Sequence, residues 1–184
     1  IQRSIIDGKK YLGLTSFYLN DNIDEGDIID NLKIDINERI TYGESIDLLS
    51  TKASSFLIKT LQKIKDGEKI IKQNSFKTTY AKKIKKNEYN ISLNNNSKNI
   101  HNKIRGLTPP GCYIYFNKKK VKIFKTFYNN NFLPIGNYKF IDNILQIGCQ
   151  KGCLTIEKIQ FEGKGLISAN DFKNMNFNDN IIFK

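Results

Sequence analysis

The sequence is poor in several residue types, and each scarcity excludes a class of protein. It has no tryptophan, one methionine, three prolines, three cysteines and a single histidine. Three cysteines at irregular spacing do not form a disulfide framework, so we expect a reducing, cytoplasmic setting. From a single histidine in this context, no Ser/His/Asp or Cys/His nucleophile arrangement can be assembled. The sequence is therefore not that of a disulfide-rich secreted domain or a triad hydrolase.

Long apolar runs and phosphate-binding glycine motifs are also missing. No segment approaches the roughly 18 to 20 apolar residues of a membrane span, and no signal-peptide pattern opens the chain. There is no G-x-G-x-x-G motif and no phosphate loop. We expect no membrane association, and a monomer of one or two small domains in 184 residues. Because the sequence begins at Ile1 rather than Met, we expect a processed protein or a fragment.

Positive charge is abundant but unevenly placed. Lysine supplies 27 of the 30 basic residues, and a genome rich in A/T codons would favour such an excess. That bias would act evenly, whereas residues 1–68 hold nine basic and twelve acidic residues, and residues 69–184 hold twenty-one and six. The asymmetry predicts a second half that faces a polyanion. A solvated, lysine-rich surface that only keeps the protein soluble is the alternative.

The first part of the chain has the pattern of an α/β domain. Runs at 12–20 and 28–36 predict two strands, separated by a polar loop. Thr41 and Glu44 form a capping box, and Asp66-Gly67 ends the helix that follows. The apolar stripe of this helix consists of Ile46, Leu49, Ala53, Phe56, Leu57, Leu61 and Ile64. One strand pair and one helix cannot bury a core alone, so residues 1–68 predict the last part of an α/β domain.

The second part is predicted to be mainly β. Residues 69–90 read as a basic linker, and a short helix with Ser97 as its N-cap follows. Five short strands are predicted at residues 112–116, 121–127, 138–140, 144–149 and 154–161, and Ser168 with Asp171 caps a last helix. Residues 91–184 therefore predict a small OB-like β-barrel domain.

A loop between the first two strands concentrates carboxylates. Its acidic residues are Asp21, Asp24, Glu25 and Asp27. Calcium binding of the EF-hand kind is not expected, because Ile23 and Leu32 occupy the third and twelfth positions, where oxygen ligands belong. Clustered carboxylates at a strand end can orient a histidine for proton transfer. An acidic surface turn in which Gly26 supplies a positive φ is the alternative.

We expect no metal site from the cysteines and the histidine. The spacing of Cys149 and Cys153, taken with Cys112 and His101, matches no common zinc site. All three cysteines lie in apolar, strand-like runs, which predicts buried small hydrophobic residues. His101 is predicted to lie at the surface or to contact phosphate.

Three basic clusters predict contact with nucleic acid, for which lysine supplies point charges that neutralise phosphates without reading sequence. They are Lys82, Lys83, Lys85 and Lys86 in the linker; Lys98, Lys103 and Arg105 on the short helix; and Lys118, Lys119 and Lys120 at a hairpin tip. Nearby tyrosines at positions 80, 89, 113 and 115 are able to stack on unpaired bases, although about half are expected to pack inward. Shape-based RNA contact is the natural mode.

The order of motifs resembles the folate-dependent formyltransferase family. The segments that carry the resemblance are Ile1-Gln2-Arg3-Ser4-Ile5, Gly13-x-Thr15, Asp21-x-Ile23-Asp24-x-Gly26-x-x-Ile29, Thr79-Tyr80-Ala81-x-Lys83-Ile84, Ile100-His101-Asn102-x-Ile104-Arg105-Gly106 and Ile159-Gln160-x-Glu162-Gly163-Lys164. The resemblance covers essentially the whole sequence, and it implies that residues 1–68 are the C-terminal part of a Rossmann-like catalytic domain. The element around Tyr80 and the late Glu162-Gly163-Lys164 segment favour the branch that formylates methionyl-tRNA.

The resemblance implies an activity and a division of roles. Members of this branch transfer a formyl group from 10-formyltetrahydrofolate to the amino group of methionyl initiator tRNA, with no metal. Asp24 matches the aspartate of a catalytic Asn-His-Asp trio, whose Asn and His are expected before Ile1. Asp21, Ile23, Asp24 and Gly26 are implied as folate contacts, and the three basic clusters as tRNA contacts. A fragment without the Asn and His is expected to be inactive alone.

Two other functions remain open at this point. One is a sister enzyme with the same folate-dependent domain, such as a formyltetrahydrofolate hydrolase or dehydrogenase, or a sugar-nucleotide formyltransferase. The other is a non-enzymatic RNA-binding module, which has no need of the acidic loop or the long helix.

Overall fold

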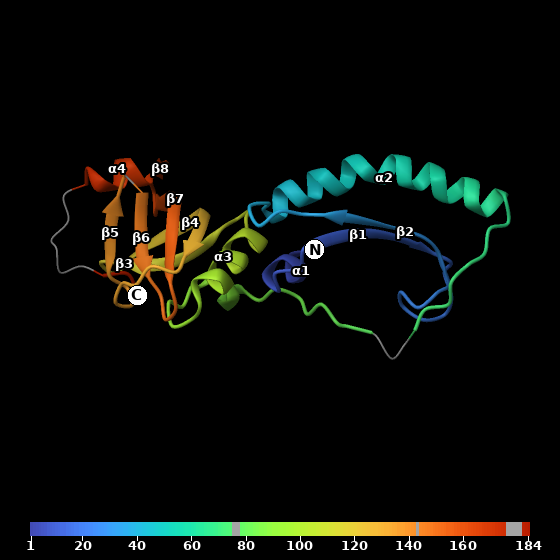
Figure 1. The fold of residues 1–184 in the computed structure, drawn as a ribbon, viewed down its shortest axis with the longest axis horizontal. Coiled ribbons are helices and arrows are strands. Elements are labelled where there is room, and N and C mark those ends of the chain that lie inside the picture. The colour runs from blue at the N-terminus through green and yellow to red at the C-terminus, as the bar shows by residue number, and fades with distance from the viewer. Residues whose placement is uncertain (75–77, 143, 176–181) are drawn as a thin grey trace. The chain divides into compact units, whose positions relative to one another are not determined.

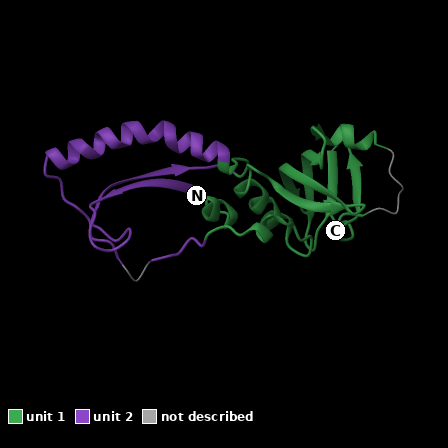
Figure 2. Cartoon of the chain, turned by 180° about the vertical axis from the view of Figure 1, so that it is seen from behind, with its two compact units in different colours: residues 1–9, 38–42, 83–184 green, residues 10–37, 43–82 purple. Residues whose placement is uncertain are grey.

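A computed structural model describes residues 1–74, 78–142, 144–175 and 182–184 of the chain (Figure 1). The chain divides into two compact units, coloured separately in Figure 2. Unit 1 comprises residues 1–9, 38–42 and 83–184, and unit 2 comprises residues 10–37 and 43–82. The domain boundaries predicted after residues 68 and 90 remain predictions.

Unit 2 is a two-stranded sheet accompanied by a long helix. β1 (Tyr11–Phe17) and β2 (Ile28–Asp35) pair antiparallel, and α2 (Tyr42–Lys65) follows them. The hydroxyl oxygens of Ser16 and Thr60 lie 3.2 Å apart and join the sheet to the helix. Gly67 has a φ of +68° just after the last helical turn. The predicted order of strand, acidic loop, strand and helix, with its end at Asp66-Gly67, is confirmed.

The apolar stripe of α2 is only partly covered within unit 2. Leu49 and Thr60 are buried on one face, whereas Leu57 and Leu61 of the predicted stripe are each 57% exposed. A single pair of strands provides too little apolar surface to bury the whole stripe. This exposure agrees with the expectation that one strand pair and one helix do not bury a core by themselves.

Two helices of unit 1 pack closely at a glycine. α1 (Gln2–Ile6) lies against α3 (Ser97–Gly106). A Cβ atom at Gly106 would lie 2.8 Å from the Ile6 Cγ1 atom and 3.1 Å from the Gln2 carbonyl oxygen, so a larger residue would force the helices apart. The N-cap predicted at Ser97 is wrong. Asn96 caps α3, because its side chain accepts a hydrogen bond from the backbone N–H of Lys98.

The rest of unit 1 is built on an antiparallel sheet. Its strands are β3 (Cys112–Phe116), β4 (Lys119–Asn129), β5 (Tyr138–Ile141), β6 (Ile144–Gly148), β7 (Cys153–Phe161) and β8 (Leu166–Ser168). They are ordered β3-β4-β7-β6-β5, with β8 paired to β7. A 3₁₀ turn, η2 (Lys86–Tyr89), precedes α3, and α4 (Ala169–Lys173) follows β8. The five predicted strands are confirmed, as is the Ser168–Asp171 cap of α4, while β8 was not predicted.

The sheet is not a closed barrel within the described residues. No strand pairing joins β3 to β5, the two ends of the sheet. Near this gap, Phe183 forms a bridge with Phe116 of β3 and its backbone N–H donates to the carbonyl oxygen of Gly136. The described residues therefore form an open sheet, and the closed OB-like barrel predicted from the sequence is not seen.

The core of unit 1 lies between the sheet and its helices. Ile100 and Ile104 of α3 are buried, together with alternating residues of β3, β4 and β7. A second group is aromatic: the Phe116 ring centroid lies 5.3 Å from that of Phe172 and 4.6 Å from that of Phe183. Among the described residues, no helix is long and apolar enough to span a membrane.

Candidate functional site

The loop between β1 and β2 holds Asp24 in a turned conformation. Asp24 has a φ of +58°, in the left-handed region that aspartate tolerates better than most residues. Gly26 is buried, and a Cβ atom there would lie 1.5 Å from the Tyr18 carbonyl oxygen, so only glycine fits. The side-chain amide of Gln73 donates to the carbonyl oxygens of Asp24, at 2.9 Å, and Gly26, at 2.7 Å. The positive φ expected at Gly26 is thus at Asp24 instead, and Gly26 is required by close packing.

The acidic side chains of this loop face solvent. Asp21, Asp24 and Glu25 are exposed, and the intervening Ile23 side chain is 90% exposed. In the described part of the chain, the Asp24 carboxylate makes no hydrogen bond or ion pair of its own. Backbone contacts therefore fix the loop and leave this carboxylate available to accept hydrogen bonds from another group.

The single histidine does not lie at the surface, and the sequence-based prediction for it is wrong. His101 is 2% exposed, and its Nδ1 lies 2.9 Å from the Thr126 hydroxyl while its Nε2 lies 2.7 Å from the Glu38 carbonyl oxygen. The ring stacks on Phe127 at a centroid distance of 6.4 Å. Burial lowers the pKa of the imidazole. Both ring nitrogens are occupied, so His101 serves the packing of unit 1.

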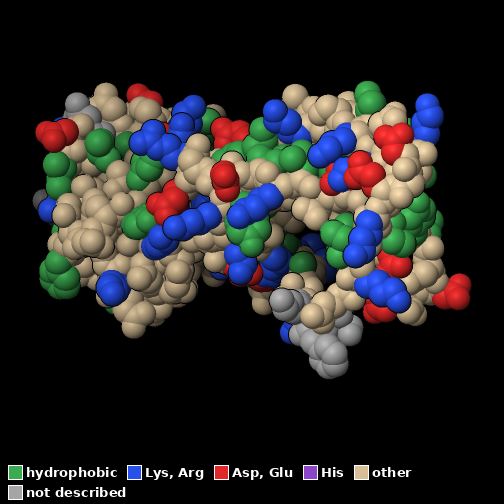
Figure 3. Space-filling view, turned by 45° about the vertical axis from the view of Figure 1, so that its right-hand side comes forward, with side chains coloured by type: hydrophobic (Ala, Val, Ile, Leu, Met, Phe, Trp, Pro, Cys, Tyr) green, Lys and Arg blue, Asp and Glu red, His purple; other side chains and the backbone are tan. Residues whose placement is uncertain are grey.

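The linker lysines are exposed, as a contact with a large anion requires. They are Lys82 in unit 2 and Lys83, Lys85 and Lys86 in unit 1. Tyr80 beside them is 87% exposed, whereas Tyr89 packs against the core of unit 1. Figure 3 shows lysine and arginine side chains distributed over the visible surface, with acidic groups between them.

The three basic residues predicted on α3 have different surroundings. The Lys98 ammonium is exposed and lies 3.0 Å from the Glu38 carboxylate, which raises the pKa of Lys98. The Lys103 ammonium donates to the carbonyl oxygen of Asn90 at 2.8 Å. Arg105 is buried, and its Nε donates to the Asn102 side chain at 2.9 Å. Burial also lowers the pKa of Arg105. Because protein groups enclose its guanidinium, we remove Arg105 from the proposed RNA contacts.

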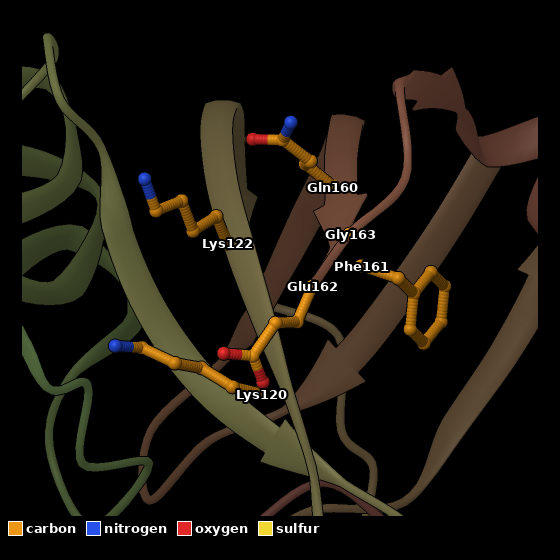
Figure 4. Close-up of a pocket in the computed structure, with 6 residues that line it drawn as sticks. All are labelled: Lys120, Lys122, Gln160, Phe161, Glu162 and Gly163. Atoms are coloured by element: carbon orange, nitrogen blue, oxygen red, sulfur yellow. The ribbon is translucent and has the colours of Figure 1, made fainter.

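The β3–β4 hairpin tip carries the third basic cluster and adjoins a pocket. Lys118 and Lys119 are exposed at the tip, and the Lys120 ammonium lies 4.1 Å from the centroid of the Tyr113 ring. A pocket of about 270 Å³ opens between β4 and the end of β7. Its lining residues are Lys120, Lys122, Gln160, Phe161, Glu162 and Gly163 (Figure 4).

Most of this pocket was not predicted from the sequence. Lys120 was predicted as an RNA contact because it stands in a run of lysines, whereas Lys122, which lies directly across from Gln160 on β7, was not. Lysines two residues apart on a strand share a face, so the Lys120-x-Lys122 spacing was the available signal. Gln160, Glu162 and Gly163 appeared only within a family motif, with no role assigned to them.

The cysteines behave as predicted. Cys112, Cys149 and Cys153 are buried and free. Burial raises the pKa of Cys112 to about 12 and that of Cys149 to about 11, so both remain protonated thiols at neutral pH. Over the residues that the structure describes, no group of three or more His, Cys, Asp or Glu side chains is placed to hold a metal ion.

Comparison with known proteins gives one family match and a consistent set of relatives. The family described as formyl transferase, C-terminal domain, matches residues 83–176. A methionyl-tRNA formyltransferase from Clostridium novyi is 34% identical over 166 residues, which is 88% of this chain and 54% of that protein. The enzyme of the same name from Rickettsia prowazekii is 34% identical over 176 residues, 94% of this chain and 57% of that protein. The chain thus spans little more than half the length of these relatives.

Solved structures share the fold at lower identity. WlaRD, a sugar 3N-formyl transferase crystallised with dTDP and 5-N-formyl-THF, has a TM-score of 0.60 and 23% identity, covering 89% of this chain and 59% of its own. HypX from Aquifex aeolicus, in complex with tetrahydrofolic acid, has a TM-score of 0.65 and 15% identity, covering 93% of this chain and 31% of its own. At these identities the likeness concerns the fold alone.

Proposed function

We propose, from the premise that this chain belongs to the formyl transferase family, that it serves the formylation of methionyl initiator tRNA by 10-formyltetrahydrofolate. In this proposal the chain contributes the aspartate-bearing loop of the catalytic site and most of the surface that holds the tRNA. The single observation that supports tRNA as the substrate is the solvent exposure of the linker and hairpin-tip lysines. It agrees with the relatives, which are named methionyl-tRNA formyltransferases. A transferase that acts on a small sugar needs no such surface.

Asp24 is the proposed catalytic carboxylate. Its exposed side chain is held on a loop that Gly26 and Gln73 fix through the backbone. A carboxylate so placed orients an imidazole and stabilises its protonated form during proton transfer. The only histidine of the chain is enclosed in unit 1 with both nitrogens hydrogen-bonded. We therefore assign the partner imidazole, and the asparagine of the trio, to residues outside this sequence.

Three of the four loop residues predicted to contact folate are exposed and able to do so. Asp21, Ile23 and Asp24 offer exposed carboxylate and apolar groups, which suit a ligand that is both polar and aromatic. Gly26 is buried, and its carbonyl oxygen already accepts from Gln73, so its proposed role is to shape the loop. Bound there, the folate supplies the formyl group, and the chain's own residues position it.

The wider features of the proposal follow the family. Residues 1–68 would complete a Rossmann-like catalytic domain, residues 69–90 would form the linker, and residues 91–184 would form an OB-like domain that helps to hold the tRNA. We propose a monomeric enzyme that acts in the cytoplasm, the compartment in which translation initiation takes place.

Substitution of Asp24 in the full-length gene product tests the proposal. Asp24→Ala and Asp24→Asn should lower the turnover number for formylation by about 10²- to 10⁴-fold, the usual worth of positioned proton-transfer groups. The Kd for methionyl initiator tRNA should stay within about twofold, since Asp24 lies outside the basic clusters. Asp35→Asn, at an exposed end of β2, is the matched control and should leave turnover unchanged. Normal turnover in both Asp24 variants would contradict the assignment.

A titration separates this function from the sister enzymes. The full-length product should bind initiator tRNA at moderate salt, with an affinity that falls steeply as salt is raised. A sugar-nucleotide formyltransferase or a formyltetrahydrofolate hydrolase should show no saturable tRNA binding under these conditions. Folate-dependent formylation would in turn exclude a non-enzymatic RNA-binding module.

A further inference from the structure

The pocket beside the β3–β4 hairpin contains both cations and hydrogen-bond acceptors. Lys122 faces Tyr113 on one neighbouring strand and Gln160 on the other. The backbone N–H of Glu162 donates to the Lys120 carbonyl oxygen at 3.3 Å, which places the Glu162 side chain at the rim. In Figure 4 the side chains of Lys120, Lys122 and Gln160 extend from the same side of the strands.

The polar side chains of this pocket keep hydrogen-bonding and ion-pairing capacity for a ligand. Among the described residues, neither Lys122 nor Glu162 forms an ion pair. The Gln160 Nε2 donates to the Lys164 carbonyl oxygen at 2.9 Å, so the Gln160 Oε1 is left as an acceptor. A ligand that satisfies this set carries an anion for the two ammonium groups and a hydroxyl or N–H for the acceptors.

Neither Phe161, which lines the pocket, nor Tyr113, which lies beside it on β3, offers a stacking surface. The Phe161 ring turns away from the opening and stacks on Phe172 in the core, at a centroid distance of 5.9 Å. The Tyr113 ring is covered by the Lys120 ammonium. A base held in this pocket would lack the stacking on which single-stranded recognition depends. The groups present suit a sugar and its phosphate better than a base.

We propose that this pocket binds the ribose–phosphate backbone of RNA, with Lys120 and Lys122 at a phosphate and with Glu162 and Gln160 as acceptors for the ribose 2′-hydroxyl. The proposal rests on the proposed function, since it names how the RNA substrate is held. Lys118, Lys119 and Lys164 lie beside the pocket in the chain, so the positive surface extends beyond one phosphate. A carboxylate among phosphate-binding lysines would only repel DNA, but the 2′-hydroxyl gives it a donor in RNA.

The test compares two hairpins bound by the full-length gene product. Both have the acceptor-stem sequence of initiator tRNA, one with ribose and one with 2′-fluoro sugars, which keep the A-form helix but carry no hydroxyl donor. The wild type should prefer ribose, and Glu162→Ala should reduce that preference by about three- to tenfold, the worth of a partly exposed hydrogen bond to a charged acceptor. Glu162→Gln keeps an acceptor and should retain most of the preference. Glu157→Ala, which removes an acid paired with Lys125, is the control and should leave the preference unchanged.

A second variant tests the phosphate contact. Lys122→Ala should weaken both hairpins equally and should reduce the slope of log K against log salt by about 0.7 to 0.9. Lys139→Ala removes one exposed lysine from β5, at the other end of the sheet, and should change neither quantity.

The outcomes separate this inference from the proposed function. If the product binds no tRNA, the proposed function fails. If tRNA binds normally but Glu162→Ala leaves the ribose preference intact, or Lys122→Ala leaves the salt slope unchanged, only the pocket assignment is overturned.

Discussion

Gly26→Ala is the sharpest perturbation of the proposed catalytic loop, because the loop has no room for one methyl group. The added Cβ atom would lie 1.5 Å from the Tyr18 carbonyl oxygen and 2.7 Å from its carbonyl carbon. Real Cβ atoms stay beyond 3.0 Å from such atoms, so the backbone must shift by well over an ångström. The atom in the way belongs to the backbone and has no rotamer by which to move aside.

The displacement should reach Asp24. The Gln73 side chain bonds the carbonyl oxygens of both Asp24 and Gly26, so a shift at Gly26 breaks or redirects the same clamp. If the loop keeps its conformation, overpacking of this size lowers the free energy of unfolding by about 1 to 3 kcal/mol. If the loop backbone moves instead, the Asp24 carboxylate is displaced by an ångström or more, which commonly lowers the rate about 100-fold.

The assay measures kcat for formylation, the Kd for tRNA and the midpoint of urea unfolding on the full-length gene product. Gly26→Ala should lower kcat, the unfolding midpoint or both, and should leave the Kd for tRNA unchanged. Gly165→Ala is the matched control, because nothing lies within 4 Å of a Cβ atom there and all three quantities should stay at wild-type values. A Gly26→Ala protein with normal kcat and normal stability would refute the close packing of this loop.

Three further predictions concern charged and titrating groups. Replacing the four linker lysines (Lys82, Lys83, Lys85 and Lys86) by alanine should reduce the salt slope of tRNA binding by about 3, and an unaltered slope would count against their contact with phosphate. Arg3 lowers the pKa of Glu88 to about 2, so Glu88→Gln should reduce the free energy of unfolding by about 1 kcal/mol at pH 7. In urea unfolding, this difference between variant and wild type should disappear as the pH falls from about 4.5 to 2. Burial lowers the pKa of His101, so native stability should fall as the pH drops below about 6.5, and His101→Gln should flatten that dependence in thermal unfolding between pH 5 and 7.

Local signals predicted the elements of the fold well. The helix α2, the strand runs of unit 1 and the Ser168–Asp171 cap depend on residues a few positions apart, and all appear in the structure. β8 was missed because its three residues are too few to show a period. The barrel prediction rested on the number and length of the strands, which do not determine whether the edge strands pair.

Burial of single polar residues was harder to predict. His101 and Arg105 follow Ile100 and Ile104 by one position, and the sequence suggested that they pointed away from the core. They are buried because residues 38–42 cover that side of α3, where the Glu38 and Ile40 carbonyl oxygens accept hydrogen bonds from them. A contact between segments about 65 residues apart leaves no trace in local spacing. The pocket was missed for the same reason, since β4 and the end of β7 meet only in the folded sheet.

The pairing of charges distinguishes structural groups from those to which we assign function. Asp30 is 8% exposed and lies 3.0 Å from the Lys63 ammonium, which lowers the pKa of the carboxyl group. Within its own unit, that charge accepts a hydrogen bond from Lys63 at one oxygen and lies 3.6 Å from the Lys59 ammonium at the other. Lys63→Ala should therefore lower the free energy of unfolding measured in urea, because it removes the hydrogen bond of a buried carboxylate. Asp24, Lys122 and Glu162 have no ion-pair partner among the described residues, although each is held on a backbone fixed by hydrogen bonds or strand pairing. Removing such a charge costs the fold little, so a loss of activity or RNA affinity on its removal reports a missing contact with substrate rather than a damaged protein.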